Sequence, residues 1–97
     1  MKILAVEKEY PRFGADAFKP HLKSEAARVW ELYQAGIIRE AYFRQDRPEA
    51  VLMLECANIE EAREILNSLP LVKEKLIAFE IIPLKPYSGF SRLFSSE

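Results

Sequence analysis

The chain has 97 residues, 49% of them hydrophobic and 30% charged, a size that gives one domain with a core and excludes a multidomain protein. Its 14 basic and 15 acidic residues leave a net charge of -1, so no overall field attracts nucleic acid or an anionic membrane, and we expect neither as a partner. One histidine and one cysteine exclude an intramolecular disulfide and a metal site of the usual ligand spacings.

The chain begins with MKILAVEKEY, an apolar run that becomes charged too soon for a signal peptide. No segment is apolar for long enough to span a bilayer. Cys56 follows a second apolar run, as expected of a buried thiol in a reducing compartment. We therefore expect a cytoplasmic protein whose residues 1–97 form a single domain.

The first two elements are a strand and a long helix. Residues 2–9 are β-favouring apolar residues that pass into alternating charges, which predicts a strand. After a loop, residues 18–36 have helical periodicity, with Asp16 as the expected N-cap and Pro20 in the first turn, where its missing N–H matters little. Gly36 suits the left-handed residue that ends a helix.

One face of this helix is apolar and is expected to turn toward the core. Glu25 falls within the apolar arc, about 40° from Val29 on the helical wheel. His21 lies one turn before Glu25 and Arg28 about one turn after it, so three ionisable groups share an edge of this face. The apolar side chains of the face are those of Phe18, Leu22, Ala26, Val29, Trp30, Leu32 and Tyr33.

A hairpin follows the helix. Residues 37–45 alternate as a strand does, and a turn at 46–48 leads to residues 49–56, which are apolar on both faces and predict a central strand. One face of the first of these strands is unusually polar. The alternation places on this face Ile38, Glu40, Tyr42 and Arg44.

The last helix and strand have clear boundaries. Asn58, with Glu61 three residues later, predicts an N-cap and its capping-box partner, and Pro70 is expected to end the helix. Residues 76–84 predict a final apolar strand that is ended by prolines. The tail, 85–97, is too apolar to remain free in water. Its large apolar side chains are those of Tyr87, Phe90, Leu93 and Phe94.

The order strand, helix, strand, strand, helix, strand predicts an α+β, ferredoxin-like βαββαβ fold, a four-stranded antiparallel sheet with both helices on one face. Residues 51–54 and 77–82 are apolar on both sides of their strands, so the other face of the sheet is hydrophobic as well. A second copy would cover this face. We expect a homodimer or larger homo-oligomer that forms a dimeric α/β barrel, with the apolar tail crossing to a neighbour.

Several positions carry a family resemblance. The sequence resembles the muconolactone delta-isomerase family at four places. These are Gly36 after the first helix, Leu-Pro-Leu at 69–71 after the second helix, Pro-Leu at 83–84 after the last strand, and the segment 86–88. The resemblance implies the dimeric α/β-barrel fold, assembly into oligomers and proton transfer on a small lactone without a cofactor. Glu25 falls where that family carries an acidic residue. A weaker resemblance, of His21 in position, is to the YciI-like proteins of the same fold.

Moving a carbon-carbon double bond next to a carbonyl requires a base, an acid or the same group to return the proton, and a donor for the enolate. Glu25 and His21 are the candidate catalytic residues, since burial of Glu25 would raise its pKa toward neutrality. The alternative is structural, with Glu25 near the helix start and paired with Arg28 at i+3.

Candidate ligand-binding residues follow from residue type. Arg28, Arg39 and Arg44 carry guanidinium groups that could clamp a ligand carboxylate, or could be solvated surface charges. Tyr33 and Tyr42 could line a pocket between sheet and helix, or could be ordinary core residues. Three functions remain open: a cofactor-free isomerase acting on a small lactone or oxo acid, a non-catalytic small-molecule binder, and an oligomerisation domain. A cavity reached by Glu25 would favour the first two.

Overall fold

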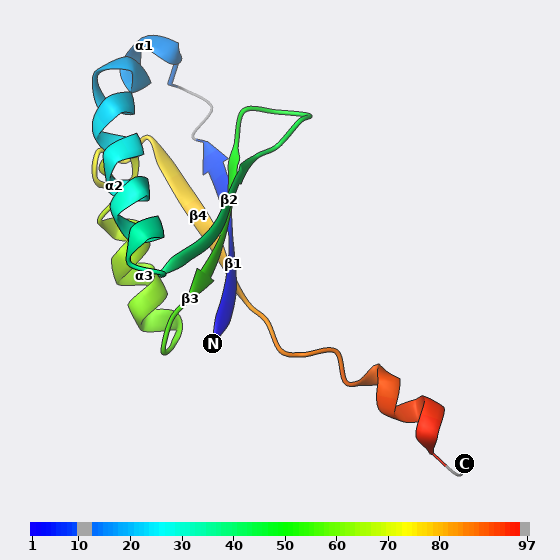
Figure 1. Ribbon diagram of the computed structural model, residues 1–97. Helices are drawn as coiled ribbons and strands as arrows, with labels where there is room; N and C mark the ends of the chain where they lie inside the picture. The colour runs from blue at the N-terminus through cyan, green and yellow to red at the C-terminus, as the bar shows by residue number, and fades with distance from the viewer. Residues whose placement is uncertain (10–12, 96–97) are drawn as a thin grey trace.

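The computed structural model describes residues 1–9 and 13–95, and its sheet and helices follow the predicted order (Figure 1). Two short 3-10 helices, η1 and η2, accompany the strands and α-helices. The elements are β1 (Lys2–Glu9), α1 (Ala15–Phe18), η1 (Lys19–His21), α2 (Leu22–Gln34), β2 (Ile38–Phe43), β3 (Ala50–Glu55), α3 (Ile59–Asn67), α4 (Pro70–Lys73), β4 (Ile77–Pro83) and η2 (Gly89–Phe94).

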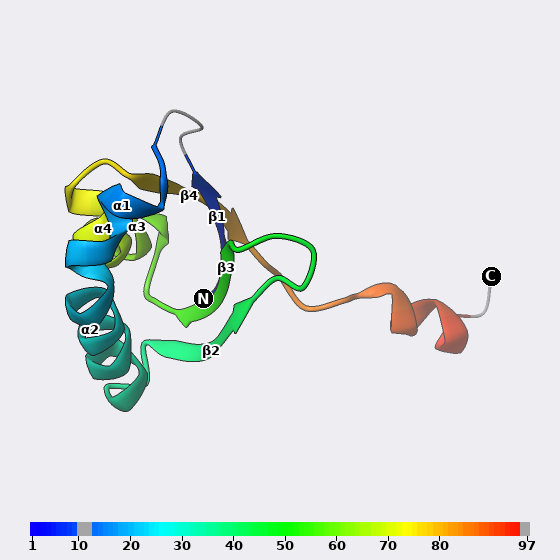
Figure 2. The same ribbon diagram turned by 90° about the horizontal axis from the view of Figure 1, so that it is seen from above.

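The four strands form one antiparallel sheet in the order β2-β3-β1-β4. This is the ferredoxin-like α+β arrangement, so the predicted fold is confirmed. The α-helices lie on one face of the sheet, and no helix formed by the described residues covers the other face (Figures 1 and 2). Strands β2 and β4 are the two edges, which places the end of the chain at the edge opposite to β2.

The first predicted helix is broken near its start. Pro20 lacks the N–H of a regular helix, and the chain forms α1 and the 3-10 turn η1 before α2 begins at Leu22. The prediction of Asp16 as N-cap is wrong, because Gly14 occupies the cap of α1 and Asp16 lies in its first turn. The prediction for Gly36 is confirmed: its φ is 79°, and Ile37 N–H donates to the Leu32 carbonyl over 3.0 Å, as in a Schellman motif.

A bulge in β2 changes which side chains face the helices. Ile38 pairs with Leu54, and Glu40 pairs with the adjacent Met53, so the register shifts at the residue between them. Ile38 is therefore 1% exposed on the helix side, whereas Glu40 lies on the opposite face. The expectation that both share one face is wrong, because strict alternation fails where an extra residue enters the strand.

The second predicted helix has the predicted N-cap, but the segment that follows it differs from the prediction. The Asn58 side chain accepts a hydrogen bond from Glu61 N–H over 2.8 Å at the start of α3. Pro70 does not simply end this helix. It occupies the first turn of α4, where a proline is tolerated because the early N–H groups of a helix have no intrahelical partner.

The buried side chains form two clusters on the helix side of the sheet. The larger cluster lies under α3 and the end of α2, with Leu32, Ile38 and Leu54 near its centre. The smaller cluster contains Leu71 and Ile77, and Phe18 packs against it. The two ends of the α1-η1-α2 segment are therefore packed against different clusters, and the middle of α2 stands between them.

The opposite face of the sheet and the tail expose apolar side chains. Leu4, Val6, Val51, Met53 and Ile82 share the face without helices, as their pairing in the sheet requires. Beyond Pro83 the chain leaves the domain on this side and forms η2 (Figure 2). The radius of gyration is 16.2 Å, against about 12.5 Å for a compact chain of this length, because the tail projects from the body.

Candidate functional site

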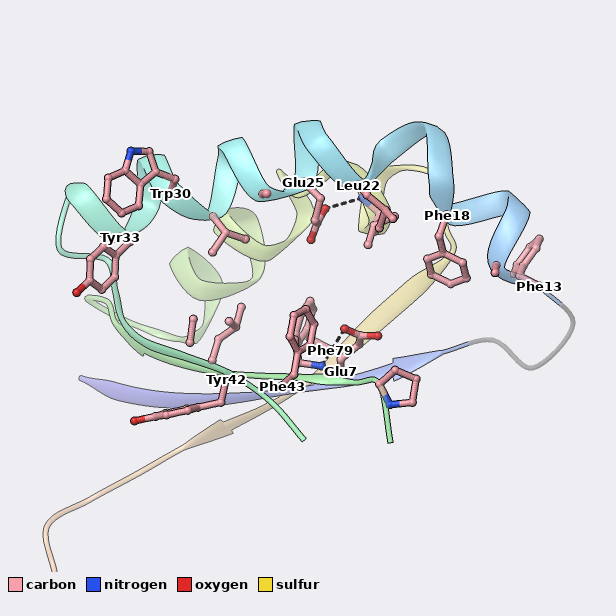
Figure 3. Close-up of a pocket in the computed structure, with 18 of the residues that line it drawn as sticks. Glu7, Phe13, Phe18, Leu22, Glu25, Trp30, Tyr33, Tyr42, Phe43 and Phe79 are labelled. Atoms are coloured by element: carbon pink, nitrogen blue, oxygen red, sulfur yellow. Dashed lines mark hydrogen bonds between the residues drawn. The ribbon is translucent and has the colours of Figure 1, made fainter. Parts of the chain in front are cut away.

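A pocket of about 910 Å³ lies between the middle of α2 and the helix side of the sheet (Figure 3). Its size is suited to a small organic ligand. Its walls come from every layer of the domain and are mainly apolar. The lining residues are Glu7, Phe13, Gly14, Ala15, Phe18, Leu22, Glu25, Ala26, Val29, Trp30, Tyr33, Ala41, Tyr42, Phe43, Pro48, Ala50, Leu52, Leu71 and Phe79.

Small side chains on facing elements make room for the pocket. Ala41 and Ala50 lie on the helix side of β2 and β3, paired with Leu52 and Phe43. Ala26 faces them from α2. Large residues at these three positions would let the helix and sheet interdigitate as in an ordinary core. The three alanines therefore leave the space between the helix and this part of the sheet unfilled.

The apolar face of α2 lines this pocket and fills it only in part. Leu22 and Tyr33 are each 51% exposed and Trp30 is 58% exposed, whereas Leu32 alone in α2 is buried. Phe43 is 80% exposed on the opposite wall. We call Leu22, Trp30, Tyr33 and Phe43 the rim. Apolar side chains gathered around an unfilled volume are typical of a ligand or partner site.

Glu25 points into this pocket from α2 (Figure 3). Its Oε1 accepts a hydrogen bond from Leu71 N–H over 2.9 Å. That N–H is one of the early donors of α4, which have no partner within the helix. Burial raises the pKa of Glu25, and the hydrogen bond from Leu71 opposes the rise without cancelling it. A carboxyl group that takes up a proton more readily than in water is thus placed in an apolar site.

A second carboxylate in the pocket was not singled out from the sequence. Glu7 is 6% exposed on β1, and its Oε1 accepts a hydrogen bond from Ala50 N–H over 3.0 Å. Figure 3 shows Glu7 on the sheet side of the pocket and Glu25 on the helix side. The signal was present in the alternation of β1, because Ile3 and Ala5 share the face of Glu7.

His21 and Arg28 do not line the pocket. His21 ends η1 and precedes α2, where its carbonyl accepts a hydrogen bond from Ser24. Arg28 lies on another side of α2, donating to Ser68 Oγ over 3.0 Å and pairing with Glu31 over 3.1 Å. The pair of Glu25 with Arg28, which was the structural alternative for Glu25, is absent from the ion pairs of the described residues. Its place is taken by the hydrogen bond between Glu25 and α4.

The candidate binding residues in β2 and directly after it lie largely outside the pocket. Arg39 donates to the carbonyl of Gly36 over 2.5 Å. Arg44 pairs with Asp46 in the hairpin turn and holds the pKa of Asp46 below its usual value. Tyr42 borders the pocket, but its ring points away on the other face of the sheet (Figure 3). Its hydroxyl donates to Glu40 over 2.6 Å, which raises the pKa of Tyr42.

Of the predicted site residues, Glu25, Tyr33 and Tyr42 line the pocket, and the ring of Tyr42 points away from it. Within residues 1–9 and 13–95, no cluster of three or more His, Cys, Asp or Glu side chains is placed to hold a metal ion. In the same part of the chain, no helix has the length and apolar character needed to cross a membrane. The arrangement favours reversible protonation of Glu25 next to an apolar or aromatic ligand.

No protein-family model matches the chain, and no curated protein matches it. Among solved structures, the fold is similar to that of 5-chloro-2-hydroxyhydroquinone dehydrochlorinase from Burkholderia phenoliruptrix, in complex with 2,5-dihydroxybenzoquinone. The TM-score is 0.73, with 16% sequence identity over 92% of this chain and 98% of the other. At this identity the likeness shows a shared fold, and it agrees with the ferredoxin-like arrangement of the sheet and helices.

Proposed function

We propose that the protein is a cofactor-free enzyme that binds a small unsaturated lactone or similar oxygenated ring and moves a proton on it. The observation that carries this proposal is Glu25, a carboxyl group with a raised pKa on the wall of an apolar pocket of about 910 Å³. A general base works best when its pKa approaches the operating pH. The resemblance of the sequence to the muconolactone delta-isomerase family and the fold shared with an enzyme of small cyclic substrates support it.

The reaction is a transfer of one proton. Glu25 takes a proton from the carbon next to the lactone carbonyl, and the electrons of that C–H bond move onto the carbonyl oxygen as an enolate. The protonated Glu25 then gives the proton to the far carbon of the allylic system, which shifts the double bond. Tyr33, which lines the pocket, is the candidate donor to the enolate oxygen.

The pocket favours an uncharged substrate. The pKa of Glu25 is raised by burial, and no cation within residues 1–9 and 13–95 is among the causes of this shift. The described lining includes no lysine, arginine or histidine. A ligand carboxylate would therefore lack a counter-charge in this part of the pocket, and burying it beside Glu25 would be unfavourable. We accordingly favour a neutral lactone over an oxo acid.

A non-catalytic binding protein is the second candidate. The hydrogen bond from Leu71 to Glu25 gives this carboxylate a structural role at the start of α4, which needs no chemistry. The pocket itself would serve a binder equally well. The third candidate, a purely structural domain, is disfavoured because the interface between α2 and the sheet is unfilled.

The test is proton exchange in deuterated water. A β,γ-unsaturated γ-lactone is incubated with the protein, and deuterium entry and double-bond movement are followed by NMR. We expect exchange above the buffer rate with the wild type and with Glu31→Gln, a matched change on the exposed side of α2. Exchange should be lost in Glu25→Gln, which keeps the hydrogen-bond acceptor for Leu71. Equal exchange in wild type and Glu25→Gln would overturn the proposal, and binding of the lactone without exchange would favour the binding protein.

We also propose that the protein forms a homodimer through the face of the sheet that has no helices. The apolar side chains of Leu4, Val6 and Met53 lie on this face, and two such faces can cover each other in aligned sheet packing. A twofold pair buries both faces at once. The dimeric α/β barrel expected from the sequence corresponds to this arrangement.

A further inference from the structure

We infer that the C-terminal segment of one copy, residues 84–94, covers the rim of the pocket of a second copy. This inference rests on the proposed pocket and dimer and adds a component of the site, because part of its wall would come from the partner. It follows from three features of the described chain: the exposed side chains of the segment, the direction in which it leaves the sheet, and the pairing register of the strands.

The segment exposes more apolar surface than a free tail would tolerate. Tyr87, Phe90 and Phe94 are exposed by 69%, 66% and 86%. At about 150–250 Å² per aromatic side chain, these three alone offer roughly 400 Å² per copy for burial. Leu84 and Leu93 add to this surface. The three rings of both segments together offer about 800 Å², half of the roughly 1,600 Å² of a specific interface, before the leucines and the sheet faces are counted.

The aromatic part of the segment is preorganised. The rings of Tyr87 and Phe90 meet edge to face with centroids 4.9 Å apart. Gly89 permits this, because a side chain at that position would collide with the Tyr87 ring. The chain thus holds its aromatic groups in a compact arrangement that stands away from its own domain (Figure 2). Preorganisation of this kind lowers the entropy lost on binding.

The segment leaves the sheet far from the pocket of its own copy. Residues 84–94 follow β4, whereas the rim residue Phe43 lies on β2, at the opposite edge of the sheet. The segment also projects on the side without helices, whereas the pocket lies on the helix side (Figures 2 and 3). To cover its own pocket, the segment would have to pass around the sheet.

A second copy removes this difficulty. When two sheets pack face to face about a twofold axis parallel to their strands, the β4 edge of each lies over the β2 edge of the other. Five extended residues, 84–88, span about 17 Å, more than the spacing of about 10 Å between packed sheets. The segment of one copy can therefore reach the β2 edge of its partner.

The strand register determines the position, measured along the strand direction, at which the segment reaches the partner. Pro83 pairs with Ile3, Ile3 with Leu54 and Leu54 with Ile38, so the end of β4 and the start of β2 lie in one row across the sheet. The start of β2 directly follows the end of α2, where Trp30 and Tyr33 stack with centroids 5.8 Å apart. A twofold axis parallel to the strands does not change the position along the strand direction. The segment therefore reaches the Trp30–Tyr33 end of the partner's rim.

Trp30 is the only tryptophan of the chain, so its fluorescence reports directly on the rim. In the full-length wild type we expect Trp30 emission at short wavelength and weak quenching by acrylamide. Phe90→Ser/Phe94→Ser should shift the emission to longer wavelength and raise the quenching constant about twofold, since uncovering restores most of the accessible surface of the ring. Lys85→Gln/Arg92→Gln, two polar changes in the same segment, should leave both unchanged.

Mixing separates coverage by the partner from coverage within one chain. The Phe90→Ser/Phe94→Ser chain is mixed with a full-length Trp30→Phe chain, which has an intact segment and no fluorescence of its own from tryptophan. After exchange of subunits, a return of short-wavelength emission confirms coverage by the partner. Unchanged emission overturns the inference, as does a wild type in which Trp30 is already fully accessible or in which the segment binds lipid vesicles instead.

The lactone exchange assay distinguishes failure of this inference from failure of the proposed function. If Trp30 is covered but no lactone exchange occurs, the inferred contact between copies stands and the proposed enzymatic function is refuted. If lactone exchange occurs but Trp30 is always accessible to solvent, the proposed enzymatic function stands and the inferred contact between copies is refuted. Circular dichroism of each variant establishes that the substituted chains are folded.

Discussion

Glu25 has two functions in the structure that make opposite demands on its charge. As the acceptor for Leu71 N–H it is favoured by a negative charge, whereas its position in an apolar pocket disfavours that charge. The raised pKa shows that burial has the larger effect. Glutamine keeps an acceptor for Leu71 N–H and removes the buried charge, whereas alanine removes both the acceptor and the charge. The two substitutions therefore separate the structural contribution of Glu25 from its chemistry.

Glu25→Ala should lower the free energy of unfolding by about 1 kcal/mol, because it leaves the half-buried Leu71 N–H without its acceptor. Glu25→Gln keeps an acceptor and should be at least as stable as the wild type at pH 7. Urea denaturation followed by circular dichroism measures both. Equal stability of the alanine and glutamine variants would show that the hydrogen bond contributes nothing.

The pH dependence of the same pair of proteins follows from the direction of the pKa shift. Since the pKa of Glu25 is higher in the folded than in the unfolded chain, its favourable contribution is fully present below about pH 4.5, the unfolded value. It is lost as the pH rises through the folded pKa. The stability of the wild type relative to Glu25→Gln should therefore fall over this range. A constant difference from pH 4 to 7 would contradict the raised pKa.

At the level of secondary structure, the chain could be divided correctly from local patterns because most boundaries have a local chemical cause. Gly36 ends α2, Asn58 begins α3, and the apolar alternation of β1 matches its observed bounds. One error has a cause that is not local, because the bulge of β2 depends on its pairing with β3. The other lies at Pro20, whose missing N–H breaks the first predicted helix into α1, η1 and α2.

The candidate site was only partly predictable for the same reason. A charged residue on an apolar helix face was sufficient to identify Glu25. Its partner, Leu71 N–H, is 46 positions away in the sequence, and no spacing rule connects them. Arg39, Arg44 and Tyr42 are residue types that bind ligands, but the bulge and the hairpin turn direct their side chains to neighbours outside the pocket.

Gly36→Ala should lower the free energy of unfolding by about 1 kcal/mol, because φ at this position is 79° and an L-residue adopts this conformation only with strain. No atom lies within 4 Å of the added methyl group, so a steric clash does not contribute. Thermal and urea unfolding measure the effect. Gly36→Asn is the matched control at the same position and should cost less, because Asn adopts the left-handed conformation more readily than Ala.

At the scale of the whole molecule, the two faces of the sheet have different uses. The helix side contains the packed clusters and the pocket, and the other side exposes a continuous apolar strip. Met53→Lys places a charge in the middle of this strip without entering the core. We expect the wild type to have the mass of a dimer in light scattering and the variant that of a folded monomer. Met53→Leu should remain a dimer, and a dimeric Met53→Lys would place the contact elsewhere.

The separation of the two packed clusters along α2 has a consequence for how such a chain can evolve. Leu22, Ala26, Trp30 and Phe43 line the pocket but belong to neither cluster. Selection for a different ligand can therefore replace these residues while the side chains that maintain the fold are conserved. Descendants of one ancestor could diverge widely in what they recognise and retain the same architecture, and a laboratory library restricted to these four positions would explore new specificities at little risk of unfolding.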